Sequence, residues 1–123
     1  MSSYFKELQQ KLTTKEVTLD LPSSMTNLLA DYASRGDIEL EPFVSNSAKQ
    51  YLLLDINPTV YPNSNTVGLI IRLPYSLLLK LWWKAKKNSC TISQIVTEAL
   101  GFSIPVLLDE IQAQEEYRLE LAQ

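Results

Sequence analysis

Hydrophobic and polar residues alternate along two short segments of this chain, residues 16–21 and 68–73. The apolar members are Val17, Leu19 and Leu21 in the first segment and Leu69, Ile71 and Leu73 in the second. An alternation with a period of two predicts a strand with one buried and one exposed face. Pro22 and Pro74 follow these strands, and a proline removes a strand amide while suiting the first turn of a helix.

A helical period follows each predicted strand. The apolar positions recur four residues apart, at Met25, Leu29 and Ala33 after the first strand and at Leu77, Leu81 and Ala85 after the second. This spacing predicts a helix with one buried face. Gly36 and Asn88 then fall where a left-handed residue would end each helix. A second helix follows in each half, starting near Pro42 in the first and capped by Thr91 or Ser93 in the second.

The two halves match when the chain is shifted by 52 residues. The shift places Leu21, Pro22, Ser24, Leu29 and Ala33 on Leu73, Pro74, Ser76, Leu81 and Ala85. We interpret the match as an internal repeat of one strand and two helices. The predicted segments are a leading helical segment (1–14), a first unit (15–54), a Pro/Asn-rich linker (55–66), a second unit (67–103) and a C-terminal amphipathic helix (104–123) that starts at Pro105. All five segments together have the length of one compact domain.

This pattern resembles the ribbon-helix-helix class, the MetJ/Arc/CopG group of DNA-binding regulators. The resemblance is carried by a strand ending near proline, a short helix and a helix opened by "TISQIVTEAL". It covers residues 67–102 strongly and residues 15–52 more weakly. In that family two chains each contribute one strand to an antiparallel ribbon, and their four helices form the shared core.

A single unit of this kind is not expected to fold alone, because an isolated strand leaves a row of amides unpaired. We therefore predict a mainly α fold with a two-stranded antiparallel β-ribbon, in which the tandem copies form a pseudo-dimer within one chain. The C-terminal helix follows this pseudo-dimer. Strand 16–21 is expected to pair with strand 68–73, so that Thr18 and Ile70 lie side by side.

The resemblance implies that the outer face of the ribbon reads base edges in the DNA major groove. The outward positions are Glu16, Thr18 and Asp20 on the first strand and Gly68, Ile70 and Arg72 on the second. Arg72 suits guanine, Thr18 can donate or accept a hydrogen bond, and Ile70 suits a thymine methyl group. Glu16 and Asp20 can accept from cytosine but repel phosphate. Arg72 can instead pair with either carboxylate across the ribbon, which leaves its role open.

Family members also hold a phosphate at the amino end of the second helix. Thr91 and Ser93 occupy that place in the second unit and suit an anion. Glu39 and Glu41 occupy it in the first unit and oppose one. The sequence thus makes one half of the platform suitable for DNA and the other half unsuitable.

Positive charge is concentrated in the middle of a chain whose net charge is −3. Residues 1–60 have a net charge of −3, residues 61–100 of +4 and residues 101–123 of −4. Four of the basic residues are Lys80, Lys84, Lys86 and Lys87. They form either the solvated outer face of a helix or a set of phosphate contacts that positions the protein without reading sequence.

The first helix of the second unit carries more apolar side chains than its buried face needs. Leu79 and Trp83 correspond to the polar Asn27 and Asp31 of the first unit, and Trp82 adds aromatic area beside them. Such a patch is expected to have a partner. Either the C-terminal helix folds back over it, or it is an interface for another protein or a second copy.

Several classes of function are not expected from this composition. The chain has no histidine and three glycines, so the usual proton carrier and a glycine-rich phosphate loop are both missing. Cys90 is the single cysteine, which excludes an internal disulfide, and we expect no metal site and no cofactor. An enzyme is therefore not expected. Apolar runs shorter than a membrane span and a polar N-terminus predict a cytoplasmic protein with no membrane segment.

The leading hypothesis is a sequence-specific DNA-binding transcriptional regulator whose partner is double-stranded DNA. The alternative is a ribbon-helix-helix-like protein-interaction or assembly module, or an antitoxin, with weak or lost DNA binding. Glu16, Asp20, Glu39 and Glu41 favour the alternative. The acidic C-terminal helix fits either hypothesis, as a solvated face or as an interaction segment.

Overall fold

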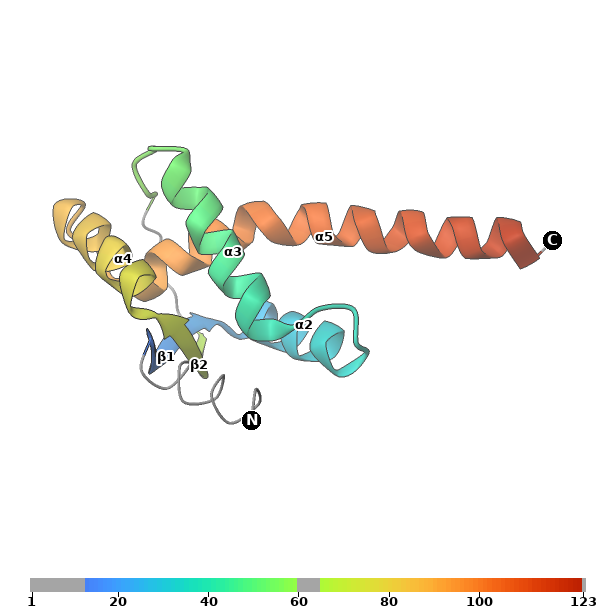
Figure 1. Ribbon diagram of the computed structural model, residues 1–123, viewed down its shortest axis with the longest axis horizontal. Coiled ribbons are helices and arrows are strands. Elements are labelled where there is room, and N and C mark those ends of the chain that lie inside the picture. The colour runs from blue at the N-terminus through green and yellow to red at the C-terminus, as the bar shows by residue number, and fades with distance from the viewer. Residues whose placement is uncertain (1–12, 60–64, 123) are drawn as a thin grey trace.

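The structure is a computed structural model that describes residues 13–59 and 65–122. Its elements, in chain order, are β1 (Thr14–Pro22), α2 (Ser23–Ser34), α3 (Leu40–Leu53), β2 (Thr66–Pro74), α4 (Tyr75–Lys87) and α5 (Ile92–Ala122). The described residues are mainly helical, and the helices pack on one face of a two-stranded antiparallel sheet, which confirms the predicted fold class at that level (Figure 1). The predicted leading helix lies outside the described residues except for its last two, of which Thr14 begins β1.

β1 and β2 pair antiparallel over their whole length. Thr18 lies opposite Ile70, as predicted, with Glu16 opposite Arg72 and Asp20 opposite Gly68. The apolar residues of the alternation face the helices: Leu19, Leu21, Ile71 and Leu73 are buried, and Val17 and Leu69 are partly buried. The predicted register is therefore the observed one.

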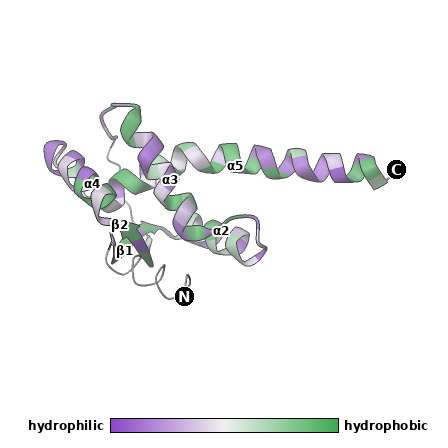
Figure 2. Cartoon of the chain, viewed as in Figure 1, coloured by the Kyte–Doolittle hydropathy of each residue, from purple (hydrophilic) through white to green (hydrophobic). Residues whose placement is uncertain are grey.

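The core lies between the inner face of this ribbon and the four helices. Its fully buried helical residues include Leu29, Val44, Ala48, Leu77, Leu81, Ile95, Val96 and Leu100. In Figure 2, hydrophobic and hydrophilic segments alternate along α3, α4 and the projecting part of α5. Burial of these side chains is the main source of stability, because each contributes about 1.5–3 kcal/mol relative to exposure.

The helix ends agree with the prediction in two places and differ in one. Gly36 adopts a left-handed conformation after α2, with φ of 80°. Thr91 caps α5, since its hydroxyl accepts from the Gln94 amide at 3.1 Å and its own amide donates to the Gln94 side chain at 2.8 Å. This is a reciprocal capping box. The left-handed residue after α4 is Ser89, with φ of 54°, because α4 continues one residue further than the prediction placed its end.

α5 is one continuous helix of 31 residues, so the predicted boundary before a separate C-terminal helix at 104–123 is wrong. Pro105 lies inside α5, where it cannot donate to the carbonyl of Gly101. Pro105 is exposed, and the helix continues through it to Ala122. Ile104 and Leu107 are buried on either side of it, and their packing keeps the helix in register.

α5 has two parts with different surroundings. Its first half crosses the core, and its second half projects away from the other elements to the C-terminus (Figure 1). By length and mean hydropathy alone α5 is long and apolar enough to span a membrane. Within that apolar window 33% of the residues are buried, against the ribbon and the other helices.

Candidate nucleic-acid interface and neighbouring surfaces

The outer face of the ribbon brings together the predicted base-reading positions. Thr18, Gly68 and Ile70 are exposed, with 65% of the Ile70 surface accessible, and Arg72 is partly exposed. The carboxylates of Glu16 and Asp20 share this exposed face. The six predicted outward positions of the ribbon together carry two negative charges and one positive charge.

Gly68 has a local role on this face. A β-carbon built on it would lie 3.1 Å from the methyl carbon of Thr18 and 3.9 Å from a carboxylate oxygen of Asp20. The first distance is shorter than normal packing allows. Gly68 thus leaves room for the Thr18 side chain to lean across to the opposite strand.

Arg72 is held by the other strand. Its Nη1 lies 3.9 Å from a carboxylate oxygen of Glu16, and its Nε donates to the Thr14 hydroxyl at 3.3 Å. The pair with Glu16 is long and more than a third exposed on each side, so it contributes under about 1 kcal/mol. Of the two roles left open by the sequence, cross-strand pairing is the one that the structure shows.

Two hydrogen bonds tie the ribbon to the helices beneath it. The Asp20 amide donates to the Ser93 hydroxyl at 2.9 Å, and the Arg72 amide donates to a carboxylate oxygen of Glu41 at 3.2 Å. Each bond joins a strand to the first turn of the second helix of the opposite half. The amino ends of α3 and α5 are therefore fixed beside the two ends of the exposed ribbon.

These two helix ends differ in chemistry. The α5 end carries the neutral Thr91 and Ser93, and the helix dipole there favours an anion. The α3 end carries Glu39 and Glu41 in place of neutral residues. The difference in charge between the two helix ends is therefore present in the folded chain, where the Thr91 hydroxyl already accepts from the Gln94 amide and the Ser93 hydroxyl from the Asp20 amide.

The lysines of α4 do not lie with the ribbon. Lys80, Lys84 and Lys87 line a hollow of about 560 Å³ together with Leu52 and Asn57, which lie at or beyond the C-terminal end of α3. The ribbon lies near the opposite, N-terminal end of α3 (Figure 1). The structure therefore separates these lysines from the base-reading residues.

The predicted aromatic patch is exposed. Leu79, Trp82 and Trp83 lie on the outside of α4, with 60% of Leu79 and 63% of Trp83 accessible. Trp82 and Trp83 meet edge to face, and Lys86 lies over the Trp82 ring at 4.7 Å. The expectation that the C-terminal helix folds back over this patch is wrong, because the rigid continuation of α5 carries it away from α4 (Figure 1).

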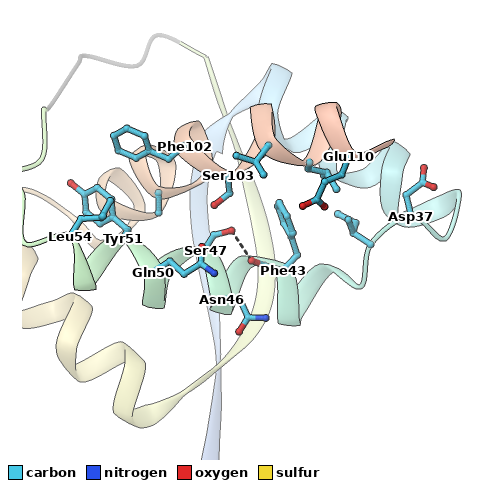
Figure 3. A pocket seen from close by; sticks show the side chains of 14 residues that line it. Asp37, Phe43, Asn46, Ser47, Gln50, Tyr51, Leu54, Phe102, Ser103 and Glu110 are labelled. Carbon is cyan, nitrogen blue, oxygen red and sulfur yellow. Dashed lines mark hydrogen bonds between the residues drawn. The ribbon is translucent and has the colours of Figure 1, made fainter. Parts of the chain in front are cut away.

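A groove of about 510 Å³ between α3 and α5 was not predicted (Figure 3). Phe43, Tyr51 and Phe102 give it apolar walls, and Asn46 and Gln50 give it a polar rim. It forms where two helices from different halves diverge. Sequence periodicity gives no signal for such a gap, because it depends on how the helices cross.

A partly buried polar contact beside this groove was also missed. The Tyr51 hydroxyl donates to Glu98, whose carboxylate also accepts from the Thr59 amide at 3.0 Å. Burial, and then the hydrogen bond to Glu98, raise the pKa of Tyr51 well above its usual value. Burial also raises the pKa of the Cys90 thiol, which lowers its reactivity. Glu98 thus links α3, the connection before β2 and α5.

Comparisons with known proteins found no matching family model, curated protein or solved structure. Within residues 13–59 and 65–122, no group of three histidine, cysteine or acidic side chains is placed to hold a metal ion.

Proposed function

We propose that this chain is a single-chain ribbon-helix-helix pseudo-dimer that binds double-stranded DNA and acts as a transcriptional regulator. The ribbon enters the major groove with its outer face toward the bases. A two-stranded ribbon has the width for this, because paired strands lie about 4.8 Å apart and the major groove is about 12 Å wide.

The start points of the elements support the pseudo-dimer. β1 begins at residue 14, α2 at 23 and α3 at 40, while β2 begins at 66, α4 at 75 and α5 at 92. Each element of the second half therefore starts 52 residues after its counterpart. This is the offset found in the sequence repeat.

The observation that carries the proposal is the pair of bonds between ribbon and helices. Asp20 and Arg72 are 52 residues apart, and so are their acceptors, Glu41 and Ser93. The Asp20 amide bonds to Ser93 and the Arg72 amide to Glu41, so each half bonds to the other through the same backbone positions. An internal two-fold axis would produce this reciprocal pair of bonds. The pair supports the pseudo-dimer even though the two acceptor residues, Ser93 and Glu41, differ in type.

The readout on DNA is proposed to be unequal between the halves. Thr18 and Ile70 meet at the centre of the ribbon and face the bases there, by hydrogen bonding and by contact with a thymine methyl group. At one end, the hydroxyls of Thr91 and Ser93 donate hydrogen bonds to a phosphate at the start of α5. At the other end Arg72 leaves Glu16 for a guanine, which costs little because the pair is weak. The preferred site is therefore not a palindrome.

The test is a fluorescence titration of the full chain against duplexes enriched from a randomised pool, at several salt concentrations. Affinity should fall steeply with salt. Arg72→Ala should weaken binding by about 1–3 kcal/mol at one base position. Glu16→Gln, which frees Arg72 and removes a negative charge, should strengthen it.

The matched control is Arg35→Ala, which removes an exposed positive charge paired with Asp31 on α2, away from the ribbon. It should change affinity far less than Arg72→Ala. The proposal fails if no duplex is enriched at about 50 mM salt, or if Arg35→Ala and Arg72→Ala act equally.

A second candidate is a protein-interaction module that has kept the fold and lost DNA binding. The specific observation for it is that Glu16 forms an ion pair with Arg72. Glu39 and Glu41 add negative charge beside the same end of the ribbon. On this hypothesis Glu16→Gln leaves DNA affinity unmeasurable. The titration above therefore separates the two candidates.

A further inference from the structure

Two surfaces of opposite charge lie without a partner at opposite ends of the molecule. One is the α4 face, formed by Leu79, Lys80, Trp83, Lys84 and Lys87. The other is the α5 tail, residues 108–122. Neither surface is used by the ribbon or by the amino ends of α3 and α5.

The α4 face is both apolar and basic. α4 carries four lysines and no acidic residue, a net charge of +4. Among the described residues, no ion pair involves any of these lysines. The face continues into the hollow beside Leu52, and Leu53 next to it is 84% exposed. It is therefore a concave surface with apolar walls and an excess of positive charge, since three lysines and one acidic residue, Asp55, line the hollow.

The α5 tail has the complementary character. Its charged residues are Asp109, Glu110, Glu115, Glu116, Arg118 and Glu120, a net charge of −4. Its most exposed apolar side chains are Tyr117, Leu119 and Leu121, each more than half accessible, and Leu108 is 37% accessible. None of its acidic side chains forms an ion pair with a described residue.

The two surfaces match in length as well as in charge. At about 1.5 Å per residue, the α4 helix of 13 residues is about 20 Å long and the α5 tail about 22 Å. They cannot meet within one chain, because α5 is continuous and leaves the core on the side away from α4 (Figure 1). Any contact between them has to be intermolecular.

We propose that the α5 tail of one molecule docks on the α4 face of a second copy of this chain. Lys80 and Lys84 are one helical turn apart, as are Glu116 and Glu120, so the two pairs can align along antiparallel or parallel helices. Trp83 and Tyr117 pack at the centre of the contact, where an aromatic anchor contributes most. If both tails dock reciprocally, the dimer closes.

The experiment uses two charge-reversed variants of the full chain, Lys80→Glu/Lys84→Glu and Glu116→Lys/Glu120→Lys. All four positions are exposed, apart from the partly exposed Lys84, so both variants should fold. Sedimentation velocity should give the wild type a mass above the 14.0 kDa of one chain, increasing with concentration. Each variant alone should remain monomeric. An equimolar mixture should regain the wild-type mass, because each tail then meets an α4 face of opposite charge.

The matched control is Arg35→Glu, a charge reversal at the end of α2, which should leave the mass unchanged. The proposal is overturned if the wild type is monomeric throughout, if either variant alone keeps the wild-type mass, or if the mixture stays monomeric. It is also overturned if Lys80→Glu/Lys84→Glu loses DNA affinity without any change in mass, since the face would then bind nucleic acid. Arg72→Ala affects only the ribbon, so failure of DNA binding leaves this measurement intact.

Discussion

Arg72 shows how one side chain on the ribbon can serve two purposes. The sequence left open whether it contacts a base or pairs with a carboxylate, and the structure pairs it with Glu16 at 3.9 Å. Because an exposed pair of this length is weak, a guanine can compete for Arg72. On the proposed function, Glu16 restrains DNA affinity, and its removal is therefore more informative than removal of Arg72 alone.

Tyr51 provides a prediction at the same scale. Its raised pKa means that the folded chain favours the neutral phenol, which donates to Glu98. This stabilisation is complete below the ordinary tyrosine pKa of about 10 and is lost as the pH rises above it. Tyr51→Phe should therefore lower the free energy of unfolding by about 1–2 kcal/mol at neutral pH. It should also reduce the loss of stability above pH ~10.

Urea denaturation at neutral and alkaline pH measures both effects. Tyr117→Phe is the control, because Tyr117 is exposed on the α5 tail. Equal pH dependence in the wild type and the Tyr51→Phe variant would contradict the assigned role of this hydroxyl.

The elements were predictable where burial follows chain periodicity. Leu19, Leu21, Ile71 and Leu73 are buried as their alternation indicated, and Gly36 ends α2 as its backbone freedom indicated. The outward positions of the ribbon follow from the same alternation. Local pattern was sufficient because each of these residues faces the core through its own strand or helix.

The features that were missed depend on contacts between distant segments. The bond of Tyr51 to Glu98 joins residues 47 positions apart, and no periodic signal marks it. The groove between α3 and α5 and the separation of the α4 lysines from the ribbon likewise depend on helix crossing. The helix boundary predicted at Pro105 was wrong for a different reason. A proline usually ends a helix, but Pro105 lies inside α5, four residues after the exposed Gly101.

α5 offers the prediction at the element scale. Pro105→Ala restores an amide that can donate to the Gly101 carbonyl, and a proline inside a helix costs about 3 kcal/mol relative to alanine. The variant should therefore raise the free energy of unfolding by about 1–3 kcal/mol. Thermal and urea denaturation measure the change.

Pro42→Ala is the matched control within the chain. Pro42 is the third residue of α3, where the amide has no helical partner, so its replacement should change stability little. If Pro105→Ala is no more stable than the wild type while Pro42→Ala is neutral, α5 does not run as one helix through residue 105.

On the scale of the whole molecule, the proposed functions use different sides of one domain. The exposed ribbon and the amino end of α5 form the proposed DNA face, which Ser93 holds in place through the Asp20 amide. The α4 face and the α5 tail remain free to join copies. A regulator built in this way could occupy neighbouring sites on DNA through contacts made away from the bases.

The most direct test of the DNA-binding account is backbone amide NMR of the full chain, with and without an enriched duplex. The account predicts shift changes concentrated in residues 14–22 and 66–74 and at residues 91–94, with the largest at Thr18 and Ile70. Shift changes confined to Lys80, Lys84 and Lys87, or none with any duplex, would contradict it.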